Sequence, residues 1–250
     1  MTLQYASDLH LEFPENRRFL EQNPLQKTGD ILVLAGDVVT FSKIELANSF
    51  FDRVSSQFER VYWLPGNHEY YGFDLSSKPT VLHEAIRPNV WLVNQATVIH
   101  NKVRLLFSTL WSHIGYTMES IIQRQLNDFY QIRFGDRLFL PSDYNRLHDE
   151  NLAFLKMELT KPFEGKTIVA THHIPTFYNY PEQYKCDDLN EAFATELFDL
   201  ISDQGPDAWI FGRHHCNMSA FTVGKTQMLT NQLGYVARGE YVSYNSCNSI

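Results

Sequence analysis

Short apolar runs and amphipathic segments alternate along this chain of 250 residues. Runs of four or five residues rich in valine, isoleucine, leucine and aromatic side chains fit buried strands better than helices. Such runs predict strands at residues 3–6, 31–35, 61–64, 90–93, 103–107, 167–170 and 208–211. Apolar side chains at helical spacing predict amphipathic helices at 43–57, 144–160 and 189–203. Alternating strands and helices are typical of an α/β fold with a largely central sheet.

Three shorter β-type runs follow late in the chain, at 220–223, 227–230 and 234–236, with glycine turns. These runs predict a hairpin or meander that closes a second sheet. Two sheets packed face to face, with helices outside, would accommodate every predicted element. The sequence contains no internal repeat, low-complexity tract or linker, so we expect residues 1–250 to form a single domain.

Residues 111–146 depart from this alternation. They contain many aromatic side chains, including Trp111, Phe129, Phe139 and Tyr144, with little clear period. One interpretation is a partly helical surface excursion with a small core of its own. The other is an insert that forms a lid or wall over a site and offers aromatic surface to a substrate. We therefore expect a lid or insert at about residues 111–146.

Candidate chemistry lies in five short segments, each of which follows or closes an apolar run. They are Asp8-Leu9-His10, Gly36-Asp37, Gly66-Asn67-His68-Glu69, His172-His173 and Gly212-Arg213-His214-His215. Loops at the carboxyl ends of strands in an α/β sheet converge on one crevice, so these side chains can meet. In an extended segment an Asp-x-His pair presents a carboxylate and an imidazole on the same side. Mixed oxygen and nitrogen donors suit Mn, Fe, Zn or Ni better than Ca or Mg.

The ordered set of five segments resembles the calcineurin-like metallophosphoesterases, whose pattern reads D-x-H, GD, GNH(E/D), a single His and GHxH. The resemblance extends from Asp8 to His215, and Gly-Asn-His-Glu-Tyr-Tyr at 66–71 looks like the small bacterial branch of that family. It implies a metallophosphatase-like fold, a four-layer sandwich of two mixed β-sheets flanked by helices. It also implies one or two divalent transition metal ions per chain, with Mn favoured, and a small phosphate ester as substrate.

The resemblance assigns roles to individual residues of this chain. Asp8, His10, Asp37 and His215 would hold the first ion, and Asp37, Asn67 and His172 would hold the second. Asp37 would bridge the two ions and His68 would protonate the leaving group, which makes both residues catalytic candidates. Two close cations clamp phosphoryl oxygens, and a bridging water becomes acidic enough to supply hydroxide near neutral pH. A positioned imidazole is worth about 10²–10⁴-fold as a general acid.

The last segment departs from the family pattern, because Gly-Arg-His-His stands where the family has Gly-His-x-His. Arg213 replaces a ligand of the second ion, and a guanidinium offers only N–H donors and keeps its charge. His214 could substitute as a ligand, or the site could be partly or wholly inactive. Alternatively, Arg213 could grip phosphate in a one-metal enzyme, with Asn67 and His68 as further phosphate-binding candidates. We expect at least one ion to bind and the second site to be weakened.

Composition narrows the possible partners. The net charge is 21 − 29 = −8 and Lys and Arg form no cluster, which argues against a membrane surface or a long nucleic acid. No apolar stretch approaches the roughly 18 residues of a membrane helix, and no signal peptide is visible. Three cysteines at unrelated spacings predict reduced thiols, so we expect a cytoplasmic protein.

These features favour a metal-dependent phosphoesterase that hydrolyses a small or nucleotide-like phosphate mono- or diester through a metal-activated hydroxide. Two alternatives remain open. One is a catalytically degenerate metallophosphoesterase fold that acts as a binding or scaffold module, for which Arg213 is the main support. The other is a nuclease. A motif does not encode the shape of the crevice, so the sequence leaves the substrate undecided.

Overall fold

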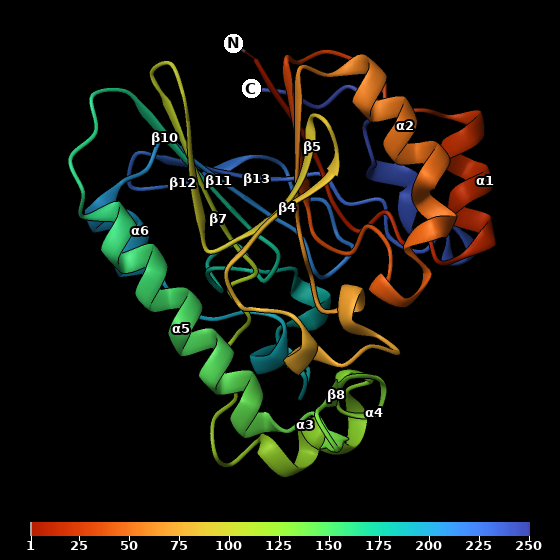
Figure 1. Cartoon of the computed structure of the whole chain (residues 1–250). Coiled ribbons are helices and arrows are strands. Elements are labelled where there is room, and N and C mark those ends of the chain that lie inside the picture. The colour runs from red at the N-terminus through yellow and green to blue at the C-terminus, as the bar shows by residue number, and fades with distance from the viewer. Residues whose placement is uncertain (1) are drawn as a thin grey trace.

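The computed structural model describes residues 2–250, and two β-sheets packed face to face form its centre (Figure 1). The first sheet has the order β1 (Leu3–Ala6), β2 (Ile31–Ala35), β3 (Arg60–Leu64), β5 (Val90–Asn94) and β4 (Leu82–Arg87). The second has the order β12 (Phe221–Val223), β13 (Thr226–Thr230), β11 (Ala208–Phe211), β10 (Lys166–Thr171), β7 (Val103–Ser108) and β6 (Ala96–His100). Both sheets are mixed, because antiparallel strands β4, β6 and β12 border otherwise parallel sets.

Helices cover the outer face of each sheet, as Figure 1 shows. These helices are α1 (Pro14–Gln22), α2 (Asn48–Gln57), α5 (Pro141–Leu159) and α6 (Phe198–Gln204). α1 and α2 pack on the first sheet, where Leu20 and Phe51 share a core with Leu34. α5 and α6 pack on the second sheet, where Leu155 shares a core with Trp209. These four layers confirm the predicted α/β sandwich of two mixed sheets flanked by helices.

Side chains that alternate along each strand form two kinds of core, one between the two sheets and one between each sheet and its helices. In β2, Ile31 and Val33 point into the core between the sheets, whereas Leu32 and Leu34 pack under the helices. Strands that are buried on both faces read as continuous apolar runs in the sequence. All seven early strand predictions are therefore confirmed to within one residue at each end.

The late β region is only partly as expected. β12 and β13 form the predicted hairpin at one edge of the second sheet. The strand predicted at 234–236 is wrong, because Gly234 adopts a left-handed φ of 69° and a 3₁₀ turn at Val236–Arg238 follows. Strands β4 and β6 were not predicted, because their partly exposed side chains interrupt the apolar pattern.

The helix predicted at 43–57 is only half correct. Its first part is a 3₁₀ segment at Phe41–Ala47, and the α-helix α2 begins at Asn48. Lys43 has a φ of −136° and a ψ of 30°, which lie outside the helical range. The predicted helix is therefore interrupted at Lys43, within the 3₁₀ segment.

The continuous helix predicted at 189–203 is wrong. A single 3₁₀ turn at Asn190–Ala192 precedes α6, which begins only at Phe198. The backbone between them pairs with the loop after β10, because Thr195 N donates to Ile174 O at 3.0 Å and Leu197 N donates to Pro175 O at 2.9 Å. This long-range pairing overrides the local helical period.

Residues 111–146 contain two short helices and a small hairpin. They are α3 (Glu119–Gln125), α4 (Asp128–Gln131), β8 (Arg133–Phe134) and β9 (Arg137–Leu138), followed by the start of α5. Figure 1 shows α3, α4 and β8 together at the lower end of the molecule. Trp111, Phe129 and Phe139 pack in the same core as α1 and α2. The segment therefore shares a main core of the fold and does not have a separate one.

The end of the chain lies along β1, an edge strand of the first sheet, and Figure 1 shows both termini on the same side. Leu3 N donates to Ile250 O at 2.9 Å and Ile250 N donates to Leu3 O at 2.8 Å. Tyr5 N donates to Asn248 O at 3.2 Å. Residues 248–250 therefore occupy hydrogen-bonding groups that β1 would otherwise leave unpaired.

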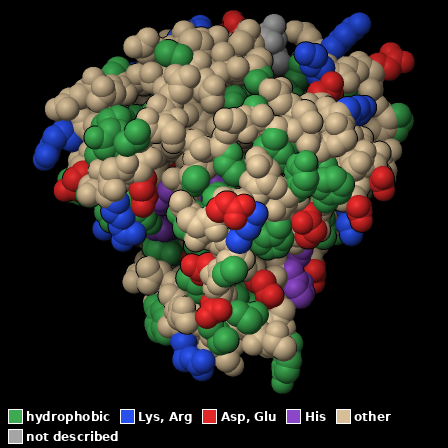
Figure 2. Space-filling model, turned by 180° about the vertical axis from the view of Figure 1, so that it is seen from behind, with side chains coloured by type: hydrophobic (Ala, Val, Ile, Leu, Met, Phe, Trp, Pro, Cys, Tyr) green, Lys and Arg blue, Asp and Glu red, His purple; other side chains and the backbone are tan. Residues whose placement is uncertain are grey.

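The surface carries both signs of charge. On the face shown in Figure 2, Lys and Arg side chains lie scattered among acidic ones and do not gather into a stripe. Within residues 2–250, no helix has the length and apolar character that a membrane crossing requires. The three cysteines are free, as the sequence predicts.

Candidate metal centre

The candidate site lies where the loops after five strands converge. The strands are β1, β2 and β3 of the first sheet and β10 and β11 of the second. The segments that follow them contain, in chain order, Asp8, His10, Asp37, Asn67, His68, His172, Arg213 and His215. Within each sheet these strands are parallel, so their carboxyl ends open on the same side. Both sheets therefore contribute to one crevice.

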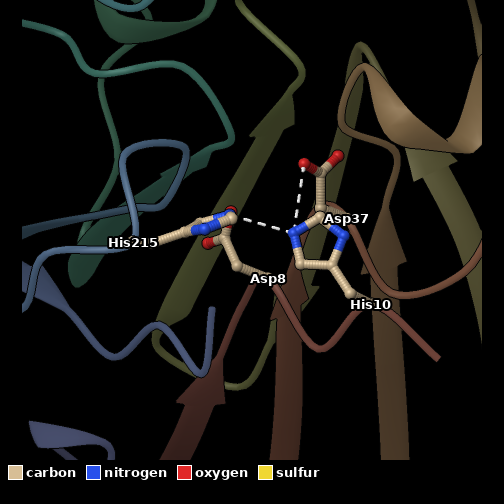
Figure 3. Close-up of side chains that lie close together, drawn as sticks. All are labelled: Asp8, His10, Asp37 and His215. Carbon is tan, nitrogen blue, oxygen red and sulfur yellow. Dashed lines mark hydrogen bonds and ion pairs between the residues drawn. The ribbon is translucent and has the colours of Figure 1, made fainter. Parts of the chain in front are cut away.

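Four side chains that the sequence predicts as ligands of the first ion come together. One potential ligand atom from each of Asp8, His10, Asp37 and His215 lies within 4.8 Å of the other three, and Figure 3 shows these groups converging. His10 Nε2 lies 2.9 Å from His215 Nε2 and 3.9 Å from Asp37 Oδ2. His215 Nε2 lies 3.4 Å from Asp8 Oδ1. Two ring nitrogens that face each other between two carboxylates suit a shared cation, so this donor set fits one divalent metal ion.

The backbone that aims these side chains is not extended. Asp8, His10, Asp37 and His215 have φ values of 56°, 47°, 54° and 54°, all in the left-handed region. The extended Asp-x-His segment expected from the sequence is therefore wrong, although both of its side chains do reach the site. A left-handed conformation costs an L-residue about 1–2 kcal/mol, and such conformations cluster at functional sites.

Gly36 makes the turn before Asp37 possible. Its φ is 89°, and a Cβ at this position would lie 2.3 Å from His172 Nδ1. His172 Nδ1 in turn lies 3.0 Å from Ala35 O. The glycine therefore allows the loop after β2 to approach the loop after β10, as its missing side chain suggested.

The carboxylates and imidazoles of the cluster shift one another's pKa values. Burial acts to lower the pKa of His215, but hydrogen bonds to two carboxylates raise it to about 9. Burial acts to raise the pKa of Asp37, but His172 and His68 outweigh it and hold that pKa well below its ordinary value. Burial also acts to raise the pKa of Asp8, but the neighbouring His215 keeps that pKa below its ordinary value. Burial lowers the pKa of His10, which favours the neutral ring that binds metals. Two buried carboxylates that remain ionised require compensating positive charge.

The predicted ligands of the second ion also lie together. His172 Nε2 is 3.2 Å from Asn67 Oδ1 and 3.4 Å from Asp37 Oδ2. Asp37 thus lies between the two predicted ligand sets, as a bridging role requires. The guanidinium of Arg213 is the fourth member, and its Nη1 donates to Asn67 Oδ1 at 2.8 Å. A donor with no lone pair therefore holds the oxygen that a second ion would need, so this set does not fit a second ion.

His68 lies beside the cluster and is held by three neighbours. Its ring stacks on Tyr71 with 4.1 Å between centroids, and its Nε2 lies 3.3 Å from Tyr235 Oη. Its Nδ1 lies 3.2 Å from Glu12 Oε1, and the same oxygen lies 3.0 Å from His10 Nδ1. One carboxylate oxygen thus orients both imidazoles, so that His10 Nε2 faces the cluster and His68 Nε2 faces Tyr235 in the cavity wall. Glu12 was not predicted as a site residue, although it follows the Asp-x-His pair at the same spacing of two.

Glu69 in the Gly-Asn-His-Glu segment has a structural role. Its two oxygens accept hydrogen bonds from the backbone N–H groups of Asp37, Val38 and Gly66, and from Trp63 Nε1. Two of these donors belong to the loop after β2, and Gly66 belongs to the loop after β3. Glu69 therefore ties together the loops that carry Asp37 and Asn67.

His214 is directed elsewhere. Its Nδ1 lies 3.0 Å from Gln232 Nε2, and its ring packs near Tyr180 and Phe211. Burial lowers its pKa to about 4. In the described part of the chain, the contacts of His214 place it with Gln232 and not with Asn67 and His172. These contacts argue against His214 as the substitute ligand.

A cavity of about 360 Å³ opens beside the cluster. Asp37, His68, Arg213 and His215 contribute to its lining, together with aromatic side chains that include Tyr180, Tyr184, Phe193 and Tyr235. Leu126 and Asn127 bring part of residues 111–146 to the same wall. A second cavity of about 480 Å³ shares His68, Tyr71, Asn127, Tyr235 and Arg238 with the first. Small-molecule sites commonly occupy roughly 300–1,000 Å³.

The family of the chain follows from comparison with known proteins. The family model described as calcineurin-like phosphoesterase matches residues 1–217, and this protein therefore belongs to that family. The match includes all five segments that carried the resemblance. The proposed small bacterial branch stays a prediction.

Two similar proteins extend the comparison. The uncharacterized protein L509 of Acanthamoeba polyphaga mimivirus is 29% identical over 260 residues, which cover 93% of this chain and 91% of the viral protein. The crystal structure of phosphopantetheinyl hydrolase (PptH) from Mycobacterium tuberculosis aligns with a TM-score of 0.72 at 14% identity. That alignment covers 98% of this chain and 94% of the other. At this identity the second comparison supports the fold alone.

Proposed function

We propose that this protein is a metal-dependent phosphoesterase that hydrolyses a mono- or diester of a small or nucleotide-like phosphate. The observation that carries the proposal is the buried cluster of Asp8, His10, Asp37 and His215, two members of which line the 360 Å³ cavity. Membership of the calcineurin-like phosphoesterase family supports the same chemistry. The cavity has the size of a small-molecule site, and its aromatic walls suit a planar group.

The cluster would hold a divalent transition metal ion through Asp8, His10, Asp37 and His215. Such an ion supplies a hydroxide nucleophile near neutral pH and offsets negative charge on phosphoryl oxygens. The mixed nitrogen and oxygen donors suit Mn, Fe, Zn or Ni, and Mn is the ion we favour. Glu240 supports the arrangement from outside, because its Oε2 lies 2.7 Å from His215 Nδ1 and fixes that ring.

Three neighbouring side chains would act on the substrate. Arg213 lines the cavity and carries a permanent positive charge, so its guanidinium can bind a phosphate group. Asn67 would position the same phosphate beside it. His68 would deliver a proton to the leaving oxygen from Nε2, while Glu12 holds the opposite ring nitrogen.

Residues 111–146 would form a wall of this site. Leu126 and Asn127 line the first cavity, and Asp128 contacts both Asn67 and Arg213. We propose that this wall, together with Tyr180 and Tyr184, selects the substrate. The similarity to PptH makes a phosphopantetheinyl ester a reasonable compound to include among nucleotide esters when substrates are compared.

Hydrolysis of bis-p-nitrophenyl phosphate with added Mn²⁺ tests the proposal. We expect turnover by the native chain and none by Asp37→Asn, because the substitution removes the charge of the carboxylate at the centre of both ligand sets. Asp136→Asn is the matched control, since Asp136 is exposed in the turn between β8 and β9. Ordinary turnover by Asp37→Asn at saturating Mn²⁺ would contradict the assigned role of Asp37.

A catalytically degenerate fold that acts as a binding or scaffold module is the second candidate. The specific observation in its favour is the hydrogen bond from Arg213 to Asn67 Oδ1, which withdraws a predicted ligand. Comparing the native chain with Arg213→His in the same assay separates the two candidates. Turnover by the variant alone would show that Arg213 disables the site, whereas turnover by the native chain places Arg213 in a working one.

A nuclease is the third candidate. The net charge of −8 and the scattered Lys and Arg side chains in Figure 2 disfavour a long nucleic-acid track. A dinucleotide would still fit the scale of the two adjoining cavities. We further propose a cytoplasmic location, which rests on the sequence alone.

A further inference from the structure

We propose that a buried ion pair between Arg213 and Asp128 takes the place of the second metal ion, so that each chain binds one divalent ion. The inference deepens the proposed function, on which it rests only in taking the first ligand set to hold an ion. Asp128 belongs to α4, in a segment to which the family pattern assigns no role. The residues that carry the inference are Arg213, Asp128, Asn67 and Phe193.

Both terminal nitrogens of the Arg213 guanidinium have partners, and an aromatic ring packs against its face. Nη1 donates to Asn67 Oδ1 at 2.8 Å and Nη2 donates to Ala192 O at 3.1 Å. Nη2 also lies 3.5 Å from Asp128 Oδ2, and Cζ lies 4.2 Å from the centre of the Phe193 ring. Arg213 is only 5% exposed. A side chain with this many partners is fixed in place, and it would not swing aside freely to admit an ion.

Asp128 supplies the negative charge that compensates the buried guanidinium of Arg213. It is fully buried, and its Oδ1 accepts hydrogen bonds from Asn67 Nδ2 at 2.8 Å and from Tyr71 Oη at 2.6 Å. A buried guanidinium is costly unless an anion compensates it. The carboxylate of Asp128 provides that compensation from a different element of the fold.

Arg213 and Asp128 together fix the amide of Asn67. The carboxylate accepts from Nδ2 and the guanidinium donates to Oδ1, so the amide cannot flip without losing both contacts. Asn67 Oδ1, which would coordinate a second ion, therefore already accepts a hydrogen bond from the Arg213 guanidinium. A dication placed beside it would also be repelled by the fixed positive charge.

The exchange of an ion for a guanidinium keeps positive charge at this end of the cavity. Arg213 Nε is buried and unpartnered among residues 2–250, and Arg213 lines the cavity beside Asp37. A phosphate in the cavity could pair with the guanidinium of Arg213 while its other oxygens face the first ligand set. The geometry thus assigns Arg213 to phosphate binding and Asp128 to positioning Arg213.

Metal stoichiometry tests the proposal without any measurement of hydrolysis. Native protein stripped of metal is dialysed against Mn²⁺, and bound Mn is counted by elemental analysis while electron paramagnetic resonance reports whether ions are coupled. We expect one Mn per chain with the signal of an isolated ion. Two Mn per chain with a spin-coupled signal, or no bound Mn at saturating concentration, would overturn the proposal.

Variants sharpen the same measurement. Arg213→His should raise the count toward two Mn per chain and produce the coupled signal, because it removes the fixed charge and adds a ligand. Arg238→His is the matched control, since Arg238 is exposed, lines the same cavity and contacts Tyr235; it should leave the count at one. A count that stays at one in folded Arg213→His would overturn the claim that Arg213 excludes the second ion.

The number of Mn ions bound per chain can be measured whether or not the protein hydrolyses an ester. One Mn per chain with no hydrolysis of any ester would support the exchange while contradicting the proposed phosphoesterase function. Hydrolysis with two Mn per chain would support the phosphoesterase function and contradict the replacement of the second ion by Arg213.

Discussion

Glu12 shows how a single carboxylate can serve two imidazoles in this site. Its Oε1 contacts Nδ1 of both His10 and His68, one a predicted ligand and the other the predicted general acid. Burial acts to raise the pKa of Glu12, but His10 and His68 outweigh burial and lower it to about 2. Glu12 therefore stays ionised, and it fixes the same nitrogen of each ring as the donor.

His68 should matter for turnover and not for metal binding. We expect His68→Ala to lower kcat by about 10²–10⁴-fold, because the leaving group loses its proton donor. Bound Mn should be unchanged, since His68 Nε2 lies near Tyr235 and outside the cluster of four. His83→Ala is the control, because His83 is exposed and stacks on Trp91 away from the site. Loss of Mn from His68→Ala would show that His68 is a ligand.

At the scale of elements, the fully buried strands were predictable, whereas the partly exposed strands β4 and β6 and several helices were not. β1, β2 and β3 are buried on both faces, so their sequences are uninterrupted apolar runs. Residues 189–203 carry a helical period, yet their backbone pairs with Ile174 and Pro175, a contact that no local pattern encodes. A local signal decides the structure only where no distant partner competes for the same backbone groups.

The site likewise contains some residues that local motifs predict and others that depend on distant contacts. The residues that follow strands, such as Asp8 and Asp37, could be found because motifs mark them. Their left-handed backbone could not be predicted, since the Asp-x-His spacing suggested an extended segment. Asp128 could not be predicted either, because its role depends on how α4 docks beside Arg213.

The loop after β2 should tolerate no side chain at Gly36. Gly36→Ala and Gly239→Ala both place alanine at a left-handed φ, which costs about 1–2 kcal/mol. Only at Gly36 would the new Cβ meet another residue, His172, whereas at Gly239 nothing lies within 4 Å. We expect Gly36→Ala to lower the free energy of unfolding by clearly more than Gly239→Ala in urea titrations. Equal losses would show that the contact with His172 relaxes easily.

At the scale of the whole molecule, the site joins both sheets. Asp8, His10 and Asp37 follow strands of the first sheet, and His215 follows a strand of the second. An ion bound by all four would therefore link the two halves of the sandwich. Because the unfolded chain cannot assemble this set, binding contributes directly to stability.

Removal of metal should lower the melting temperature. At a Mn²⁺ concentration 100-fold above Kd, one bound ion stabilises the fold by about 2.7 kcal/mol, which corresponds to roughly 5–10 °C for a chain of this size. Scanning calorimetry with Mn²⁺ and with EDTA measures the shift, and Asp37→Asn should reduce it strongly. An identical melting temperature in both conditions would mean that the cluster holds no ion.

The pairing of residues 248–250 with β1 has a consequence for how copies of this protein meet. An uncovered edge strand offers a row of free N–H and C=O groups to any other strand, and this is a common route to aggregation. Here Leu3 and Tyr5 already bond to Ile250 and Asn248. Residues 248–250 thus block association between neighbouring molecules along the edge of β1.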